Sequence, residues 1–217
     1  ANGEFSAAEI ALALGPRIAR FADSEGLQGH MAFLRRQSET VARAEILATR
    51  RPYFCSGCPH NTSTKVIDGS RALAGIGCHT LALWMDRSTE TFSQMGGEGV
   101  PWIGQAPFTE ENHVFANIGD GTYFHSGIMA IRAAVASGVN ITYKLLFNDA
   151  VAMTGGQHVD GPLTVPQITR QLAAEGVVAI RVVTDEPEKH AGVKDFAPGV
   201  TVHHRSELEA VEKRLRD

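Results

Sequence analysis

The chain has 217 residues, enough for one large domain or two small ones with a buried core. Hydrophobic residues make up 43% of it and charged residues 20%, which is ordinary for a soluble globular protein. The formal net charge is −4 and no basic run stands out, so composition argues against a nucleic-acid-binding or anionic-membrane-binding protein. No apolar stretch is long enough to span a bilayer, and the first residues lack the pattern of a secretory signal.

The three cysteines are Cys55, Cys58 and Cys78, an odd and small number that excludes a disulfide scaffold. Their close placement indicates a metal or redox role in a reducing compartment, so we expect a cytoplasmic protein. A CxxC pair with a third cysteine also suits zinc, with His60 or His79 as the fourth ligand. A thiol–disulfide couple is a third possibility. The residues alone leave these alternatives open.

Residues 1–50 read as two helices. Ser6 and Glu9 have capping-box spacing, and apolar residues recur at helical spacing from Ile10. A second helix is predicted from about Met31 to Arg50. We expect residues 1–50 to be a helical connector from a preceding domain, and the whole chain to be a fragment of a longer protein.

Residues 51–217 show a more regular pattern that predicts a second domain. The predicted strands are 113–118, 141–147, 177–183 and 201–204, and the predicted helices are 122–138, 165–175 and 206–216. Strands that alternate with helices predict an α/β fold, a three-layer sandwich with a mostly parallel central sheet. Trp84 and Met85, at the end of an apolar segment, are expected in the core.

The sharpest motif is Gly119-Asp120-Gly121, between a predicted strand and a predicted helix. Backbone amides at a helix N-terminus attract phosphate, but an aspartate there repels phosphate unless a cation stands between them. Mg²⁺ bound by Asp120 is the simplest solution. The next strand ends at Asn148, which would lie beside Asp120 if the two strands are neighbours, and the Ala150 carbonyl offers a third oxygen. Neither a dinucleotide-binding fingerprint nor a Walker P-loop occurs.

A GDG turn followed by a helix, a strand and Asn148 resembles the thiamine diphosphate motif. Three further segments appear with it: CSGCPHN (55–61), GIGCHTL (75–81) and MTGGQ (153–157). Together they make residues 51–217 similar to the thiamine diphosphate-binding domain of the 2-oxoacid:ferredoxin oxidoreductases. The similarity is greatest to the indolepyruvate ferredoxin oxidoreductases of the fused bacterial type.

The resemblance implies a role for each matching residue. Asp120, Asn148 and the carbonyl of Ala150 match the Mg²⁺ ligands. Gly119 and Gly121 frame the diphosphate turn, and Thr154, Gly155 and Gly156 match the loop over the diphosphate. Cys78 and His79 are expected to contact the cofactor. His60 and His125 lie in glycine-rich segments, which makes them candidates for contact with the cofactor or the substrate. Cys55, Cys58 and Cys78 match three of the four thiolates of a [4Fe–4S] cluster. The family's fourth cysteine lies beyond this domain, and none follows Cys78 here.

The implied activity is the oxidative decarboxylation of 2-oxoacids, especially aryl pyruvates such as indolepyruvate, to acyl-CoA. Electrons pass through iron–sulfur clusters to ferredoxin, and coenzyme A takes the acyl group. The implied partner is a pyrimidine-binding domain, from the same protein or a dimer mate, which carries the activating glutamate. We therefore expect this chain alone to bind Mg²⁺ and thiamine diphosphate weakly and not to turn over.

Residues 92–108, rich in glycine and containing Trp102 and Phe108, are predicted to form the interface with the pyrimidine-binding domain. Two alternative functions remain: a non-redox thiamine diphosphate-dependent decarboxylase or synthase, and a non-enzymatic zinc-binding module.

Overall fold

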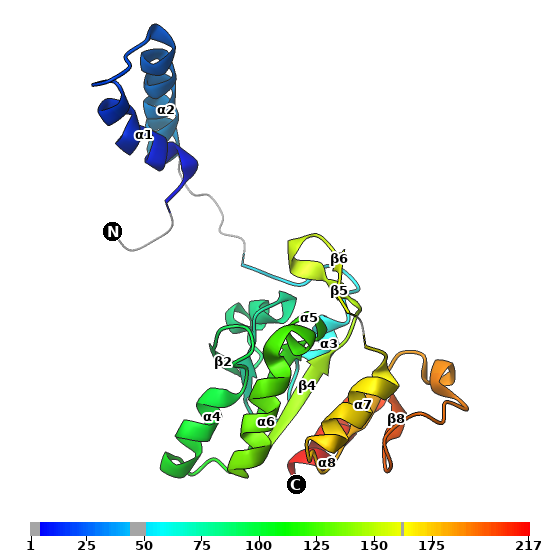
Figure 1. The fold of residues 1–217 in the computed structure, drawn as a ribbon. Helices are drawn as coiled ribbons and strands as arrows, with labels where there is room; N and C mark the ends of the chain where they lie inside the picture. The colour runs from blue at the N-terminus through cyan, green and yellow to red at the C-terminus, as the bar shows by residue number, and fades with distance from the viewer. Residues whose placement is uncertain (1–4, 44–50, 162) are drawn as a thin grey trace. The chain divides into compact units, whose positions relative to one another are not determined.

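The computed structural model describes residues 5–43, 51–161 and 163–217 (Figure 1). The chain divides into two compact units, Ala1–Arg50 and Arg51–Asp217. Each is described by itself. Among the described residues, no helix combines the length and the apolar character that crossing a membrane requires.

The first unit is a pair of helices, α1 (Ala7–Ile18) and α2 (Glu25–Arg43). The predicted capping box at Ser6 and Glu9 is confirmed. Gly15 allows the helices to pack closely, because a Cβ there would lie 2.2 Å from Sδ of Met31. The second helix begins before the predicted Met31, and its predicted end over residues 44–50 lies outside the described residues. The role of residues 1–50 as a connector stays a prediction.

The second unit is built on a parallel sheet of four strands. These are β1 (Ala72–Ala74), β2 (Thr89–Phe92), β3 (Val114–Gly119) and β4 (Ile141–Leu146), in the order β2-β1-β3-β4. All three strand pairs are parallel. Strands β3 and β4 pair from Val114–Ile141 to Gly119–Leu146, so both end at the same edge. The predicted parallel sheet is confirmed.

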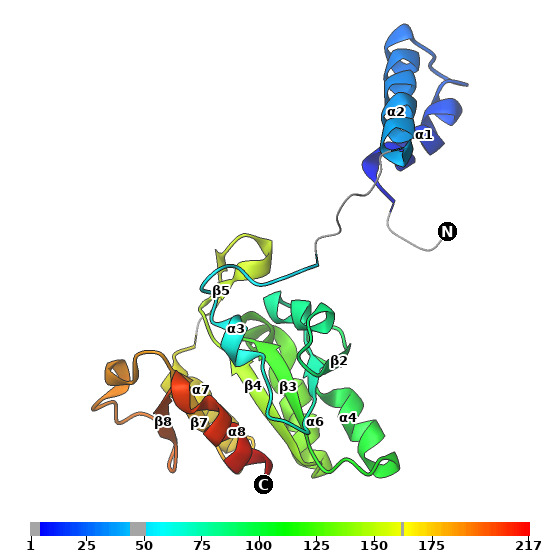
Figure 2. The same ribbon diagram turned by 180° about the vertical axis from the view of Figure 1, so that it is seen from behind.

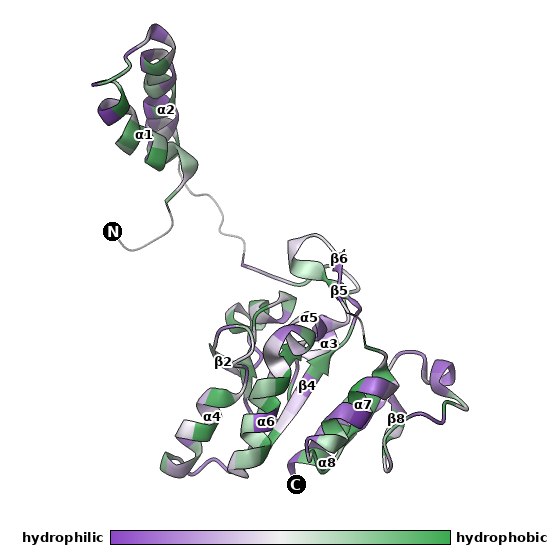
Figure 3. Ribbon diagram, viewed as in Figure 1, coloured by the Kyte–Doolittle hydropathy of each residue, from purple (hydrophilic) through white to green (hydrophobic). Residues whose placement is uncertain are grey.

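Helices cover both faces of this sheet, as Figures 1 and 2 show from opposite sides. On one face lie α4 (Val100–Gln105), α6 (Ile128–Ser137) and α7 (Val165–Ala174). Their buried side chains include Trp102, which packs on Val114 and Ala116, and Ile131, which packs on Ile118. Helix α6 is coloured mainly as hydrophobic in Figure 3. On the other face lie α3 (His60–Ser63) and α8 (Leu208–Arg216).

Helix α8 is tied to the sheet by a buried ion pair between Lys144 on β4 and Glu212. The three layers of the predicted sandwich are therefore present. Strands β7 (Arg181–Thr184) and β8 (Thr201–His204) pair in parallel as a separate small sheet, and β8 has the predicted bounds.

The chain between β3 and β4 is helical, as predicted, but it is not one regular helix. It starts with α5 (Asp120–Thr122), passes through a π-helical turn at Tyr123–Gly127, and continues as α6. Gly138, with φ 70°, ends α6 in the left-handed conformation that favours glycine. π-helical turns are frequent at functional sites.

Beyond Asn148 the chain forms a small antiparallel hairpin, β5 (Ala150–Val151) and β6 (Gln157–His158). Short 3-10 segments complete the unit at Cys78–Trp84, Ala106–Phe108, Ala152–Thr154, Pro187–His190 and Arg205–Glu207.

Two predictions about tryptophans are wrong. Trp102 was expected at an interface, but it is 1% exposed and its Nε1 donates a 3.0 Å hydrogen bond to the Asn140 carbonyl. The glycine-rich segment folds into α4 and buries it. Trp84 was expected in the core, but it is the last residue of a 3-10 helix and is 54% exposed. Phe108, the other aromatic of that predicted interface, is 88% exposed.

Candidate cofactor site

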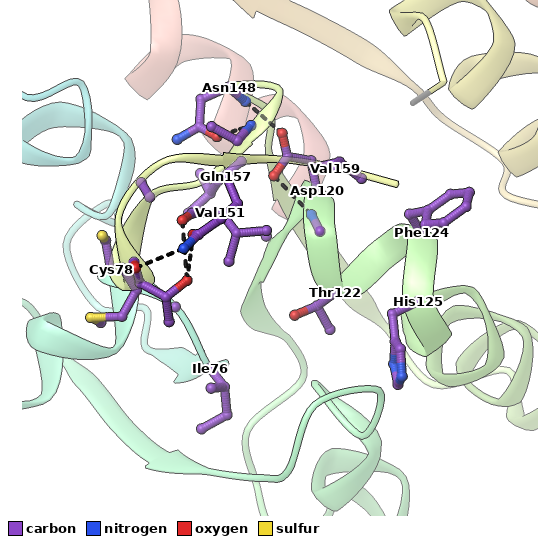
Figure 4. Close-up of a pocket in the computed structure, with 18 of the residues that line it drawn as sticks. Ile76, Cys78, Asp120, Thr122, Phe124, His125, Asn148, Val151, Gln157 and Val159 are labelled. Carbon is purple, nitrogen blue, oxygen red and sulfur yellow. Dashed lines mark hydrogen bonds between the residues drawn. The ribbon is translucent and has the colours of Figure 1, made fainter. Parts of the chain in front are cut away.

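A pocket of about 470 Å³ lies at the carboxyl ends of β3 and β4 (Figure 4). This is where parallel α/β sheets generally bind their ligands, and the volume suits a cofactor-sized molecule. Eight of the residues predicted for the cofactor or the metal line it: Cys78, His79, Gly119, Asp120, Gly121, Asn148, Ala150 and Thr154.

Asp120 is the buried centre of this site. Its Oδ1 accepts a hydrogen bond from the amide of Gly121 at 2.8 Å. Its Oδ2 accepts hydrogen bonds from the amides of Asn148 at 2.8 Å and Asp149 at 2.6 Å, and Figure 4 draws the one from Asn148. A carboxylate offers about four lone-pair positions, so these three bonds leave one on Oδ1. The carboxylate therefore joins the two strand ends and retains an acceptor position for a cation.

Asn148 lies two residues after the end of β4, and its amide oxygen Oδ1 accepts a 3.1 Å hydrogen bond from the nitrogen of Ala150. This bond turns the chain into β5 and places Ala150 against the pocket. Asp149, between them, has φ 57°, so the turn uses the left-handed backbone region. The predicted neighbours Asp120 and Asn148 are thus brought together, and their oxygens, with the Ala150 carbonyl, are the hard donors that Mg²⁺ prefers.

Thr154, Gly155 and Gly156 form the tip of the β5–β6 hairpin. Thr154 lines the pocket, and its hydroxyl donates to Oε1 of Gln157 at 2.8 Å. Gly155 and Gly156 have φ 125° and 78°, values that favour glycine, but neither lines the pocket. Of this predicted loop, the structure therefore places Thr154 at the pocket but not the two glycines.

The cysteines lie on two segments. Cys55 and Cys58 form a turn closed by a 3.0 Å bond from the amide of Cys58 to the carbonyl of Cys55. Cys78 begins a 3-10 helix and lines the pocket. Burial raises the pKa of the Cys78 thiol, and the neighbouring Cys58 and Cys55 raise it further. All three are free thiols. Within the described residues, no three His, Cys, Asp or Glu side chains are grouped to hold a metal ion.

Arg87 holds the segment that carries Cys58. Its Nη1 donates to the carbonyls of His60 at 3.4 Å and Asn61 at 2.8 Å, and to the hydroxyl of Thr64 at 3.0 Å. Its guanidinium also lies 5.4 Å from the centre of the Phe54 ring. Arg87 therefore fixes α3, and the side chain of Asn61 in that helix donates a 3.2 Å hydrogen bond to the carbonyl of Cys55 in the cysteine turn. The sequence did not single out this arginine.

The predicted His79 and the two candidate histidines, His60 and His125, all line the pocket. The rings of His60 and His79 meet edge to face, with their centres 6.2 Å apart. Burial lowers the pKa of His79 to about 4, and the charge of His60 contributes. Burial also lowers the pKa of His60, which Asp120 opposes. His79 is therefore a neutral part of the pocket wall at pH 7.

Sequence reasoning missed several pocket residues. His158 and Asp160 follow the MTGGQ segment, and Phe124 lies on the π-helical turn, half exposed at the pocket. None belongs to a motif with a fixed chemical meaning. The only available signal was proximity in sequence to Gly121 and Gln157, because the hairpin that brings His158 back to the pocket was not predicted.

Most residues that line this pocket lie in a part of the chain that matches a known protein family. Residues 75–216 match the family described as thiamine pyrophosphate enzyme, C-terminal TPP binding domain. The chain belongs to this family. The matched residues include strands β2, β3 and β4, the GDG turn and Asn148, so the predicted family and fold are confirmed.

Similar proteins carry the name indolepyruvate oxidoreductase subunit IorA. The one from Archaeoglobus fulgidus is 31% identical over 159 residues, 68% of this chain and 23% of that protein. Those from Thermococcus kodakarensis and Methanothermobacter marburgensis are 30% and 29% identical, over 65% of this chain and 25% and 26% of those proteins. The chain spans about a quarter of the length of the curated relatives it matches.

Proposed function

We propose that this chain is the Mg²⁺- and thiamine diphosphate-binding part of an oxidoreductase that oxidatively decarboxylates 2-oxoacids to acyl-CoA. The observation that carries the proposal is the junction of Asp120 and Asn148 at the ends of adjacent parallel strands, inside a pocket of cofactor size. The name indolepyruvate oxidoreductase on the similar proteins supports an aryl pyruvate as substrate.

The residues of the pocket fit the cofactor. Asp120, Asn148 and the carbonyl of Ala150 would hold Mg²⁺, which neutralises the repulsion between the Asp120 carboxylate and a diphosphate. Gly121 stands at the start of a helical segment, where backbone amides favour phosphate oxygens. The Thr154 hydroxyl would add a further donor at the hairpin.

Bound thiamine diphosphate would supply the carbanion that attacks the keto carbon and the ring that accepts the electron pair left by CO₂. The chain's own residues would orient the cofactor and exclude water. Val151, Met153 and Phe124 give the pocket an apolar wall, which suits an aryl side chain better than the methyl group of pyruvate.

For the cysteines we propose that Cys55, Cys58 and Cys78 are three ligands of a [4Fe–4S] cluster. A cluster of this kind takes four thiolates, and this chain has three cysteines. The donor set within the chain is therefore incomplete, and no step of the reaction is assigned to it. Ferredoxin as the electron acceptor, coenzyme A as the acyl acceptor and a pyrimidine-binding partner domain belong to the same proposal.

The test is an assay of the full-length protein that carries this chain, with indolepyruvate, coenzyme A and a one-electron acceptor. We expect CO₂ release coupled to reduction of the acceptor, both abolished by Asp120→Asn. The triple substitution of Cys55, Cys58 and Cys78 by serine should stop reduction of the acceptor. If CO₂ release continues unchanged in that variant, the protein is a non-redox decarboxylase. If neither activity needs Asp120, the proposal is wrong.

A further inference from the structure

Glu98 has a buried carboxyl oxygen without a partner. The residue is fully buried between Gly96 and α4. Its Oε2 accepts a 2.7 Å hydrogen bond from the amide of Gly96, and its carbonyl accepts one of 2.9 Å from the hydroxyl of Tyr143. Its Oε1 makes no hydrogen bond. A buried polar atom in this state costs about 1–3 kcal/mol, so such an atom needs an explanation.

His79 also has a buried polar atom that makes no hydrogen bond. The residue is 2% exposed, and its Nε2 is buried with no hydrogen-bond partner. The ring nevertheless forms part of the pocket wall. Its Cε1 lies 3.5 Å from the position that a Cβ at Gly119 would occupy, so the ring abuts the GDG turn. Whatever orients this ring also shapes the site beside Asp120.

The two unpaired groups approach each other at Gly75, the residue after β1. A Cβ at Gly75 would lie 2.6 Å from Cγ of Glu98 and 2.9 Å from Nε2 of His79. Any larger residue at this position would push its side chain between them. Glycine at position 75 is therefore what lets the carboxyl group and the imidazole share one small buried space.

We propose that Glu98 is a positioning residue of the cofactor pocket, whose protonated carboxyl donates a hydrogen bond from Oε1 to Nε2 of His79. One bond then satisfies both unpaired atoms. It also assigns the ring proton of neutral His79 to Nδ1. That nitrogen lies 3.0 Å from the position of a Cβ at Gly77, a residue that lines the pocket.

The charge balance of the site favours the protonated carboxyl. An ionised Glu98 would place a negative charge at a fully buried position, which is much less favourable than burying the neutral acid. Burial raises the pKa of Glu98, and backbone hydrogen bonds from the amides of Glu98 itself, Gly96 and Ile76 offset part of that rise. When Glu98 and His79 are both neutral, Nδ1–H of His79 is instead a donor directed towards an anionic cofactor. This last consequence rests on the proposed function, whereas the bond between Glu98 and His79 does not.

The first test is the tautomer of His79, read from the ¹⁵N chemical shifts of its ring in the 217-residue chain at pH 7. We expect the proton on Nδ1 in the wild-type chain. A proton on Nε2 would overturn the proposal, because Glu98 would then be the acceptor. This measurement needs no substitution, so it does not depend on a variant that folds.

The second test compares Glu98→Gln and Glu98→Leu, with Glu90→Gln on exposed β2 as the control. The amide of glutamine keeps a donor and should preserve the tautomer, whereas leucine should lose it and weaken Mg²⁺-dependent binding of thiamine diphosphate about tenfold. An unchanged tautomer in Glu98→Leu would overturn the proposal. If the tautomer responds as expected but no variant, wild type included, binds the cofactor, the proposed function fails and the positioning role stands.

Discussion

The main-chain amide of Asn148 donates a 2.8 Å hydrogen bond to Oδ2 of Asp120, across 28 positions of sequence. The bond exists because β3 and β4 are parallel neighbours that end together at Gly119 and Leu146. A single carboxylate thus fixes the two loops that line the pocket. The proposed metal site is in this sense part of the fold, and ligand binding there is expected to stabilise the unit as a whole.

Trp102 is predicted to stabilise the fold and not an interface. Trp102→Ala removes a fully buried indole and its bond to the Asn140 carbonyl, so it should lower the free energy of unfolding by about 3–5 kcal/mol. Phe108→Ala, at a residue that is 88% exposed, should change it by less than about 0.5 kcal/mol. Urea denaturation measures both, and similar stabilities for the two variants would show that Trp102 is not core.

Arg87 is predicted to hold the cysteine turn. Arg87→Met removes the donor to two carbonyls and a hydroxyl in and around α3, which should cost about 2 kcal/mol or more of stability. It should also speed the reaction of Cys58 with a thiol reagent under native conditions. Arg132→Met is the matched control, because it removes only a surface ion pair with Glu175, and such pairs contribute little to stability. Equal thiol reaction rates in the two variants would contradict the role of Arg87.

Stability is predicted to fall as the pH drops from about 6.5 to about 4. Burial, with a smaller contribution from Arg216, lowers the pKa of His113 to about 4, and His79 behaves similarly. The unfolded chain therefore binds more protons than the folded chain in this window, so acid favours unfolding. Each histidine should contribute about 2 kcal/mol between pH 7 and pH 5.

His113→Gln tests this pH dependence. The substitution removes one of the two titrating groups while keeping a polar side chain near the Thr142 hydroxyl, to which His113 is bonded at 2.8 Å. The loss of stability between pH 7 and pH 5, measured by denaturation with urea, should shrink by about 2 kcal/mol relative to wild type. An unchanged difference would mean that His113 titrates normally in the folded state.

The fold of residues 114–146 could be predicted because local signals agreed with one another. The apolar strand, the glycine turn, the helix ended by Gly138 and the next strand are each visible in the sequence, and the preference for short parallel crossovers joins them. The meeting of Asp120 and Asn148 followed from that topology. It did not depend on any property of either residue alone.

The other parts of the fold and of the site could not be predicted, because they depend on contacts between segments that are distant in the sequence. The segment from Gly96 to Phe108 looks like a loop from its glycines and prolines, and only its packing on Val114 and Ala116 makes it a helix with a buried tryptophan. Strand β2 is too short to show a periodic pattern. The burial of Glu98 has no local signal, because it follows from the close approach of Gly75 to that segment.

The central claim is that Asp120 anchors Mg²⁺ and thiamine diphosphate in this pocket. Calorimetric titration of the chain with thiamine diphosphate, with and without Mg²⁺, tests it most directly, with Asp120→Asn beside Asp149→Asn. Asp149 is exposed and only its amide bonds Asp120, so this variant should bind like wild type. Binding should require Mg²⁺, and Asp120→Asn should weaken it by more than the roughly 10–100-fold typical of losing an outer-shell partner. Binding that is independent of Mg²⁺, equal in the two variants, or absent from the wild-type chain would contradict the account.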